Sequence, residues 1–162
     1  MNVATLRERA RRTERVYHFE DFTVGRRFEH HWGRTLTEAD NTLLSTLTLS
    51  YNPVYFNRER ALADGHRDTV VNPMLVLLTT IGLSVEDLSE AGGAFLGVDA
   101  LTFHRPVLVG ETLTAASEVL SVRRSGSRPH TGVVTWHTKG RVGDETVVDF
   151  RRTNLVKSRE AR

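Results

Sequence analysis

The sequence predicts an α+β fold in which a curved antiparallel sheet of about five strands wraps round one buried helix. The stretch from Met74 to Leu83 is apolar on almost every side, which is typical of a helix that the rest of the chain covers. It is too short to span a membrane. Strand-like segments follow it to the end of the chain, and their short connections contain Gly or Pro, which favours antiparallel neighbours.

Length favours a single domain, and the lack of a long apolar run or a signal-peptide pattern leads us to expect a cytoplasmic protein. The 162 residues suit one domain, which we expect over residues 16–157, after a basic leader (residues 1–15) and before a short tail (residues 158–162). Outside residues 1–15 and 157–162 the chain has 14 bases and 17 acids, so we expect no nucleic-acid partner. No run of 18 apolar residues and no apolar core of a signal peptide occur, so we expect no membrane partner either.

A helix is predicted from Glu38 to about Leu49. Thr37 before it and Asp40 three residues later have the spacing of a capping box, in which two side chains bind free N–H groups of the first turn. Asn52 before Pro53 then forces a turn, because the residue before a proline disfavours the helical conformation. The apolar residues of the helix are spaced for one buried stripe, which consists of Leu43, Leu44 and Leu47.

The central helix is expected to begin at Asn72. Asparagine is a favourable N-cap, and Pro73 suits the first helical position because its missing N–H would have no partner there. A second, short amphipathic helix is expected over Ser84–Glu90, with Ser84 as its cap. Before the central helix, Arg58–Ala63 is predicted to form another short helix.

Strands are predicted where apolar and polar residues alternate. The first candidate, residues 26–36, places Phe28, His30 and Trp32 on one face. Because the edge strands of such a sheet have unpaired N–H and C=O groups, we expect two chains to join edge to edge. The other candidates follow the central helix and are residues 94–104, 111–123, 130–141 and 145–156.

The composition excludes several kinds of site. With no cysteine, the chain has neither disulfides nor a thiolate nucleophile. His30 and His31 are adjacent instead of spaced like metal ligands on a helix, so we expect no metal. No Gly-x-Ser-x-Gly turn supports a serine triad.

Several separated motifs agree with one family in order and spacing. They are FEDFTVGRRF, TEADN, NPVYF, VVN, FHRPVLVGETL, SRPHTGVVTWHTKG and RRTNLV, and they cover residues 17–157. On these motifs the chain resembles the MaoC-like dehydratase family, in particular its itaconyl- and mesaconyl-CoA hydratase branch. The resemblance implies a hotdog fold and an acyl thioester of coenzyme A or of an acyl carrier protein as the substrate. It implies no cofactor besides the carrier that belongs to that substrate.

The family adds or removes water across a double bond with an Asp and a His in a loop that reads like Asp-Phe-Asn-Pro-Leu-His. In this chain Ser50 and Tyr55 stand at those two positions, with Asn52 between them. A serine hydroxyl is no base at neutral pH, and a tyrosine phenol is a proton donor there. The resemblance therefore implies an altered catalytic set of Tyr55, Asn52 and Ser50, with His66 as a candidate base. The alternative is that these residues only pack and hydrogen-bond the turn.

The resemblance also implies that N–H groups at the start of the central helix bind the thioester oxygen, because helix N-termini present free donors to an anion. Pro73 has no N–H, so the expected donors are Met74, Leu75 or the side chain of Asn72. Arg128 is a candidate for binding a phosphate or carboxylate, although an exposed turn arginine is the commoner case. His104, at a strand end, is expected to be structural or exposed.

Three functional hypotheses follow. The first is a hydratase or dehydratase for acyl thioesters, with proton transfer centred on Tyr55. The second is a non-catalytic subunit that binds thioesters or completes the site of another hotdog chain, because the Asp and His are missing. The third is a thioesterase, with Asp40, Asp64 and Asp68 as candidate carboxylates. We expect a homodimer, with a heterodimer as the alternative.

Overall fold

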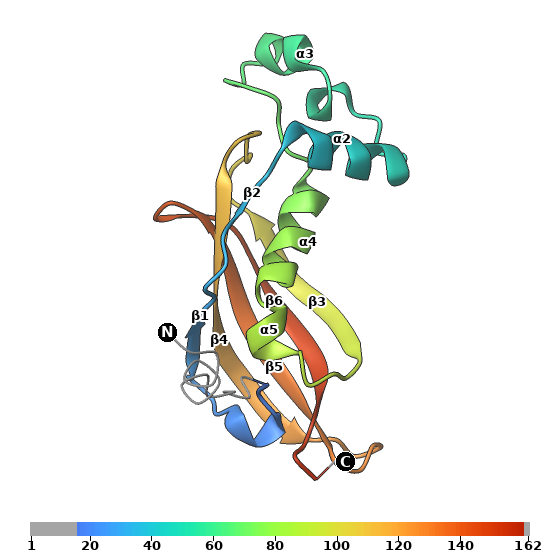
Figure 1. The fold of residues 1–162 in the computed structure, drawn as a ribbon, viewed down its shortest axis with the longest axis vertical. Helices are drawn as coiled ribbons and strands as arrows, with labels where there is room; N and C mark the ends of the chain where they lie inside the picture. The colour runs from blue at the N-terminus through green and yellow to red at the C-terminus, as the bar shows by residue number, and fades with distance from the viewer. Residues whose placement is uncertain (1–15, 161–162) are drawn as a thin grey trace, which may run out of the picture.

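The structure is a computed structural model that describes residues 16–160, so the predicted basic leader lies outside the described residues. Its main layer is an antiparallel sheet in the order β1-β4-β5-β6-β3, and β2 also pairs with β4. The sheet curves round α4 (Pro73–Leu83), as Figure 1 shows, so the predicted architecture is confirmed. The strands are β1 (Arg27–Glu29), β2 (Arg34–Thr35), β3 (Phe95–Phe103), β4 (Thr112–Arg124), β5 (Thr131–Val142) and β6 (Glu145–Lys157).

The four long strands, β3 to β6, match the predicted segments to within one residue at each end. Short turns join β4 to β5 and β5 to β6, and both pairs are antiparallel as expected. Only Gly143 and Asp144 connect β5 to β6, and Gly143 has a φ of 58°, a left-handed conformation that glycine adopts without strain. A two-residue turn of this kind fixes the register of the two strands.

The strand predicted over residues 26–36 is broken in two. β1 and β2 both pair with β4, and residues 30–33 between them belong to neither strand. His30 in this break is buried, and its ring nitrogens lie 2.7 Å from Asp87 and 2.9 Å from Ser117. The chain turns outward after His30, so Trp32 is 60% exposed and does not share the buried face of Phe28 and His30.

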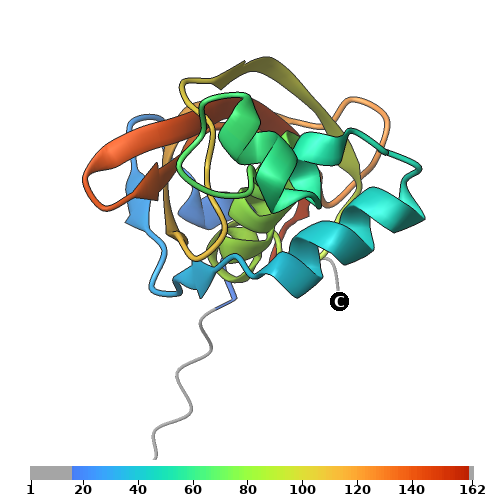
Figure 2. The same cartoon turned by 90° about the horizontal axis from the view of Figure 1, so that it is seen from above.

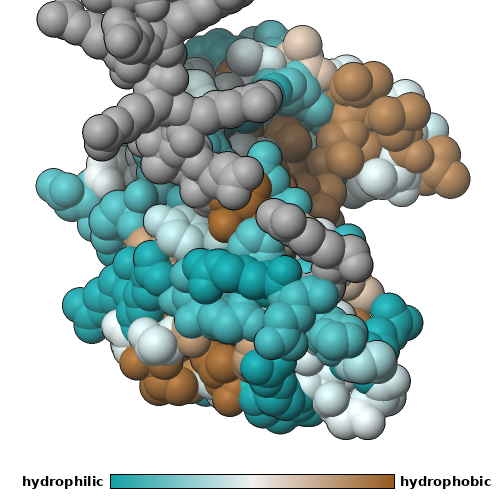
Figure 3. Space-filling model, turned by 60° about the horizontal axis from the view of Figure 1, so that its bottom comes forward, coloured by the Kyte–Doolittle hydropathy of each residue, from teal (hydrophilic) through white to brown (hydrophobic). Residues whose placement is uncertain are grey.

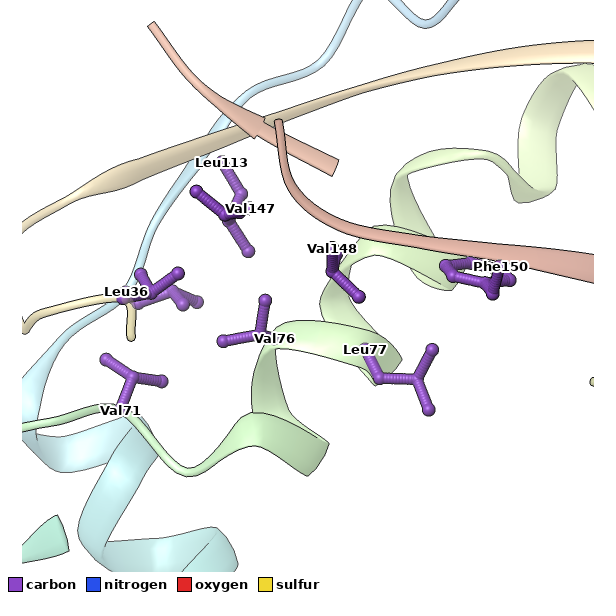
Figure 4. Close-up of a cluster of buried hydrophobic side chains, with 9 residues drawn as sticks. Leu36, Val71, Val76, Leu77, Leu113, Val147, Val148 and Phe150 are labelled. Carbon is purple, nitrogen blue, oxygen red and sulfur yellow. The ribbon is translucent and has the colours of Figure 1, made fainter. Parts of the chain in front are cut away.

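α4 begins as predicted, with Asn72 as its N-cap and Pro73 as its first residue. On the side that faces the sheet, Val76 and Leu77 of α4 are buried in the apolar cluster that Figure 4 draws. A Cβ at Gly140 of β5 would lie 2.6 Å from Thr80 Oγ1 on α4, so only glycine allows this close approach. The buried cluster round α4 consists of Leu36, Val71, Val76, Leu77, Val107, Leu113, Val147, Val148 and Phe150.

The opposite side of α4 is open in the single chain. Met74 is 44% exposed and Leu78 is 54% exposed. The expected cover round the central helix is therefore incomplete. An apolar stripe that is left open favours a further layer supplied from outside the chain.

A second cluster of buried apolar residues lies at the other end of the sheet, where α5 packs.

The helix predicted over Ser84–Glu90 is shorter in the structure, where α5 spans Val85–Leu88. Ser84 forms no side-chain cap on α5, and its Oγ instead donates to the carbonyl of Ile81 at 2.7 Å. Besides α5, the 3-10 helix η1 (Phe19–Asp21) packs here. The buried residues are Phe19, Phe22, Phe28, Leu88, Val119, Val134, Trp136 and Val156.

A helical cap, residues 37–69, lies over the end of the sheet at which α4 begins, as Figures 1 and 2 show. It contains α2 (Glu38–Leu47), the 3-10 helix η2 (Pro53–Tyr55) and α3 (Arg58–Ala63). The predicted capping box of Thr37 and Asp40 is present at the start of α2, and α3 has the predicted bounds.

The inward face of α2 is polar. Leu43 is 61% exposed and Leu47 is 72% exposed, whereas the buried residues of α2 are Asn41 and Ser45. The predicted buried leucine stripe is therefore wrong, because these two polar side chains attach α2 to Asn72 through hydrogen bonds. Figure 3 shows hydrophobic residues gathered at the upper right of the molecule, the side on which α2 lies in Figure 1.

Candidate active site

An apolar cavity of about 380 Å³ lies where the helical cap, the start of α4 and the loop after β3 meet. Its volume falls within the range of small-ligand sites, about 300–1,000 Å³. The cavity is therefore the candidate site for a small acyl group. Its walls consist of Tyr55, Val70, Val71, Pro73, Val76, Phe103, His104, Arg105, Pro106 and Val107.

Tyr55 reaches the cavity because η2 turns the chain soon after α2 ends. Pro53 begins this turn, and Tyr55 ends it with its side chain half-buried. Its carbonyl accepts a hydrogen bond from Asn41 Nδ2 at 2.6 Å, which ties the turn to α2. The structure thus brings Tyr55 to the same cavity as Pro73, the first residue of α4.

Asn52 and Ser50 lie close to Tyr55 in the chain, but neither lines the cavity. Asn52 is exposed, and its Oδ1 accepts a hydrogen bond from the N–H of Val54 at 3.3 Å, which caps η2. Ser50 is half-buried and its N–H donates to the carbonyl of Ser45 at 2.8 Å. Both residues therefore stabilise the turn through hydrogen bonds.

His66 and the three candidate carboxylates do not line the cavity either. His66 is half-buried in the loop after α3, and its N–H donates to the carbonyl of Ala61 at 3.0 Å. Asp64 pairs with an arginine at 2.9 Å and Asp68 with another at 3.1 Å. Hydrogen bonds from the Thr37 side chain and main chain hold the pKa of Asp40 below its usual range, because they favour the carboxylate.

The N–H groups at the start of α4 are already engaged. The N–H of Met74 donates to Asn72 Oδ1 at 3.0 Å, and the N–H of Leu75 donates to the carbonyl of Asn72 at 2.9 Å. Asn72 is itself buried, and its Nδ2 donates to Ser45 Oγ at 3.3 Å. A thioester oxygen would have to displace the Asn72 side chain to reach the N–H of Met74.

Arg128 lies far from this cavity. It is exposed in the turn between β4 and β5, at the opposite end of the sheet from the helical cap in Figure 1. Its main chain holds the turn, because its N–H donates to Ser125 Oγ and its carbonyl accepts from Thr131 Oγ1. The structure does not bring Arg128 together with Tyr55 in one chain.

Arg105 is a cavity residue that the sequence analysis did not select. Its guanidinium pairs with Glu111 at 2.9 Å and with Glu145 at 2.7 Å. The hydrogen bond to Glu111, followed by that to Glu145, raises the pKa of Arg105 above its usual value despite partial burial. The signal for its place was the motif FHRPVLVGETL, in which the Arg-Pro pair directly follows a strand.

His104 contributes to the cavity wall, and its ring is held by a carboxylate. His104 Nε2 lies 2.5 Å from Asp149 Oδ2, and His137 Nε2 lies 3.0 Å from the other oxygen. Burial raises the pKa of Asp149, but the hydrogen bonds from His137 and His104 outweigh this and lower it. Asp149 thereby links β5 and the end of β3 across β6.

Among residues 16–160, no three His, Asp or Glu side chains lie close enough together to hold a metal ion. None of the helices in the same residues has both the length and the apolar content that crossing a membrane requires.

Comparison with known proteins identifies the family. Residues 2–162 match the family described as mesaconyl-CoA hydratase. The chain is 39% identical over 158 residues to a mesaconyl-CoA hydratase of Haloarcula marismortui, which covers 96% of this chain and 44% of that protein. It is 32% identical over 143 residues to a β-methylmalyl-CoA dehydratase of Chloroflexus aurantiacus, covering 88% of this chain and 40% of that protein.

Solved structures share the fold. A protein described as a MaoC domain dehydratase, also from Chloroflexus aurantiacus, has a TM-score of 0.85 and 30% identity, over 93% of this chain and 43% of that one. A Mycobacterium tuberculosis protein with a double hotdog fold has a TM-score of 0.81 and 24% identity, over 91% of this chain and 46% of that one. The chain thus spans about half the length of the mesaconyl-CoA hydratases to which it is similar. It belongs to the mesaconyl-CoA hydratase family and has the hotdog fold of the MaoC-like dehydratases.

Proposed function

We propose that this chain is a hotdog unit of a hydro-lyase that acts on acyl thioesters of coenzyme A. The observation that carries the proposal is the apolar cavity, in which Tyr55 meets the start of α4. Family membership supports it. The relatives are named for mesaconyl-CoA, an unsaturated thioester, and for β-methylmalyl-CoA, which is formed by adding water to that double bond.

Water addition needs a polarised thioester carbonyl and a proton that reaches C2 as the hydroxyl group bonds to C3. In our proposal the phenol of Tyr55 donates a hydrogen bond to the thioester oxygen or supplies that proton, because it is the titratable cavity residue on the helical cap. When the phenol supplies the proton, the proton that the attacking water loses restores the phenol. The apolar walls, which include Val71 and Val76, reduce the contact of the acyl group with water.

The proposed substrate carries a second polarising group on its acyl chain. Ser50 and Tyr55 stand where the family has Asp and His, so the chain has lost its strongest base for activating water. An additional carboxyl group on the acyl chain, as in mesaconyl thioesters, makes the double bond more electrophilic than that of a plain enoyl thioester when hydrogen-bond donors neutralise its charge. Such a substrate needs less base strength at the water.

A second candidate function is a thioester-binding subunit whose hotdog partner supplies the acid and base. The engaged N–H groups of Met74 and Leu75 favour it, because both donate to Asn72 in the single chain. The length of the relatives favours it as well, since the chain matches less than half of each.

Both candidate functions involve a dimer of hotdog units. We propose that the two units pair along β3. This strand is an edge of the sheet with one free side, and apolar side chains are exposed along it. Pairing with a second hotdog unit would satisfy its free N–H and C=O groups and continue the sheet. The exposed apolar residues of β3 are Phe95, Leu96, Leu101 and Phe103.

The test is an assay of the purified chain alone with mesaconyl-CoA, a straight-chain enoyl-CoA and the matching 3-hydroxyacyl thioesters, with products identified by mass spectrometry. The first candidate function predicts water addition or loss with the chain alone. The second predicts thioester binding without turnover, and turnover once a catalytic hotdog subunit is added. Release of free coenzyme A without hydration would contradict both and support a thioesterase.

A further inference from the structure

Asn41 lies at the centre of the contact between the helical cap and α4. It is on the inward face of α2 and is fully buried. Its Nδ2 donates to the carbonyl of Tyr55 at 2.6 Å and to the carbonyl of Val70 at 2.9 Å. Its Oδ1 accepts a hydrogen bond from the N–H of Asn72 at 2.7 Å. One side chain thus joins α2 to two other segments, the turn at Tyr55 and the stretch Val70–Asn72.

These two segments form part of the cavity wall. Tyr55 and Val70 line it, and Asn72 begins the helix whose first residue also lines it. Asn41 is absent from the cavity walls, so it acts only through the residues that it holds. Because the main chains of Tyr55 and Asn72 bind the same amide group, Asn41 sets how the phenol lies relative to the start of α4.

The amide group of asparagine suits this position. It offers two N–H donors and one acceptor oxygen at the end of a short side chain. Aspartate keeps the acceptor but has no donor when ionised, and leucine has a similar shape but neither function. Either replacement leaves buried carbonyl groups without a partner, a costly change that movement of the main chain would relieve.

A second polar residue of α2 extends the contact. Ser45 follows Asn41 by one helical turn, is also fully buried, and accepts the hydrogen bond from Asn72 Nδ2. A buried network whose members are all paired fixes one arrangement more narrowly than apolar contact does. The polar face of α2 therefore holds the helical cap in one place over α4.

We propose that Asn41 is a positioning residue of the site, which holds Tyr55 at one place relative to the start of α4. The expected effect of Asn41 on turnover rests on the proposed function, whereas its effect on the position of Tyr55 rests on the hydrogen bonds alone. A displacement of about 1 Å at a site can lower turnover by about 10²-fold. Asn41 thus affects turnover without touching the substrate.

The test replaces Asn41 by leucine in protein that carries fluorotyrosine at its three tyrosines, which are Tyr17, Tyr51 and Tyr55. Fluorine NMR reports the surroundings of each ring, and single Tyr→Phe changes assign the signals. Asn57→Leu is the matched control, because Asn57 caps α3 by accepting from the N–H of Arg60 at 3.1 Å.

The inference predicts that Asn41→Leu shifts or broadens the Tyr55 signal and leaves the Tyr17 signal in place, whereas Asn57→Leu moves neither. An unchanged Tyr55 signal, or equal shifts at Tyr17 and Tyr55, would overturn it. This readout needs no substrate, so it stands apart from the proposed function. In protein that turns over, kcat falls about 10²-fold in Asn41→Leu with a smaller change in KM; the reverse pattern would also overturn the inference.

A measurement on the unaltered protein covers the case in which Asn41→Leu does not fold. The N–H of Asn72 donates to the side chain of Asn41, so its hydrogen exchange reports on that bond. We expect this N–H to exchange as slowly as those of the central strands β5 and β6. Exchange as fast as in the exposed turn at Gly126 would contradict the proposal.

Discussion

The side chain of Asn72 caps the helix that Asn72 begins, with its Oδ1 accepting the N–H of Met74 at 3.0 Å. This bond uses the first N–H that α4 can offer, because Pro73 has none. The same side chain donates to Ser45. Asn72 therefore stabilises α4 and its contact with α2 through one amide group.

Replacing Asn72 by alanine is expected to lower the free energy of unfolding by about 1–3 kcal/mol, because a cap is lost and Ser45 loses its donor. Urea denaturation checks this. Asn52→Ala is the matched control, since Asn52 forms the same kind of bond in an exposed turn at 3.3 Å. Equal effects of the two changes would contradict the assignment.

Arg152 is a buried cation that binds neutral groups. It is 2% exposed and donates to Asn154 Oδ1 at 3.0 Å, to Ser84 Oγ at 2.7 Å and to Ser89 Oγ at 2.5 Å. Burial lowers its pKa to about 10. Ser84 is the C-cap of α4, whose C-terminal carbonyl groups favour a positive charge nearby.

Arg152→Ala is expected to lower the free energy of unfolding by about 2–4 kcal/mol, because it removes three hydrogen bonds and leaves a cavity. Arg151→Ala is the control, since Arg151 is exposed and a surface change stays within about 0.5 kcal/mol. If thermal unfolding shows both variants to be equally stable, Arg152 has no structural role.

Asp149 makes the free energy of unfolding depend on pH in the acidic range. Its pKa is lower in the folded protein than the usual value of 3.8, so it stabilises the fold above that pH. This contribution is lost as the pH falls below about 4 and through the folded pKa. Urea midpoints measured across that window are expected to fall less steeply for Asp149→Asn than for the unaltered protein. Parallel curves would show that the two histidines do not stabilise the carboxylate.

The exposed edge at β3 predicts a dimer. Leu96 is 51% exposed on this strand, so Leu96→Lys is expected to shift the protein from dimer to monomer. Val24→Lys is the control, because Val24 is 67% exposed in the turn before β1, at the other edge of the sheet. Light scattering after size exclusion gives the masses. A monomer in the unaltered protein at micromolar concentration would contradict the prediction.

The long strands and the start of α4 could be predicted because their signals are local. Alternation, turn glycines and the Asn72-Pro73 pair lie within a few residues of the structure that they determine. The inward face of α2 could not be predicted in this way. Its leucine spacing is correct for a stripe, but the partners of Asn41 are Tyr55, Val70 and Asn72, which local patterns do not connect.

One residue of the candidate site, Tyr55, could be predicted because it lies in a sequence motif. The loop motif placed Tyr55, and the structure brings it to the cavity. His66 and Arg128 were selected from residue type and loop position, and neither lines the cavity, because the path of a loop depends on distant contacts. The same dependence hid Arg105, which lines the cavity because the loop after β3 pairs with the segment before α4, where the N–H of Val71 donates to the carbonyl of Val107 at 2.8 Å.

The turnover of Tyr55→Phe tests the central claim most directly, measured on the hydration assay described above with the chain alone or with its catalytic partner. The change removes one hydroxyl group and is expected to lower kcat by about 10²–10⁴-fold, the range for a lost general acid. Tyr51→Phe is the control, since Tyr51 is 60% exposed and does not line the cavity, and it is expected to keep full turnover. Full turnover in a folded Tyr55→Phe variant would remove Tyr55 from the chemistry and contradict the account.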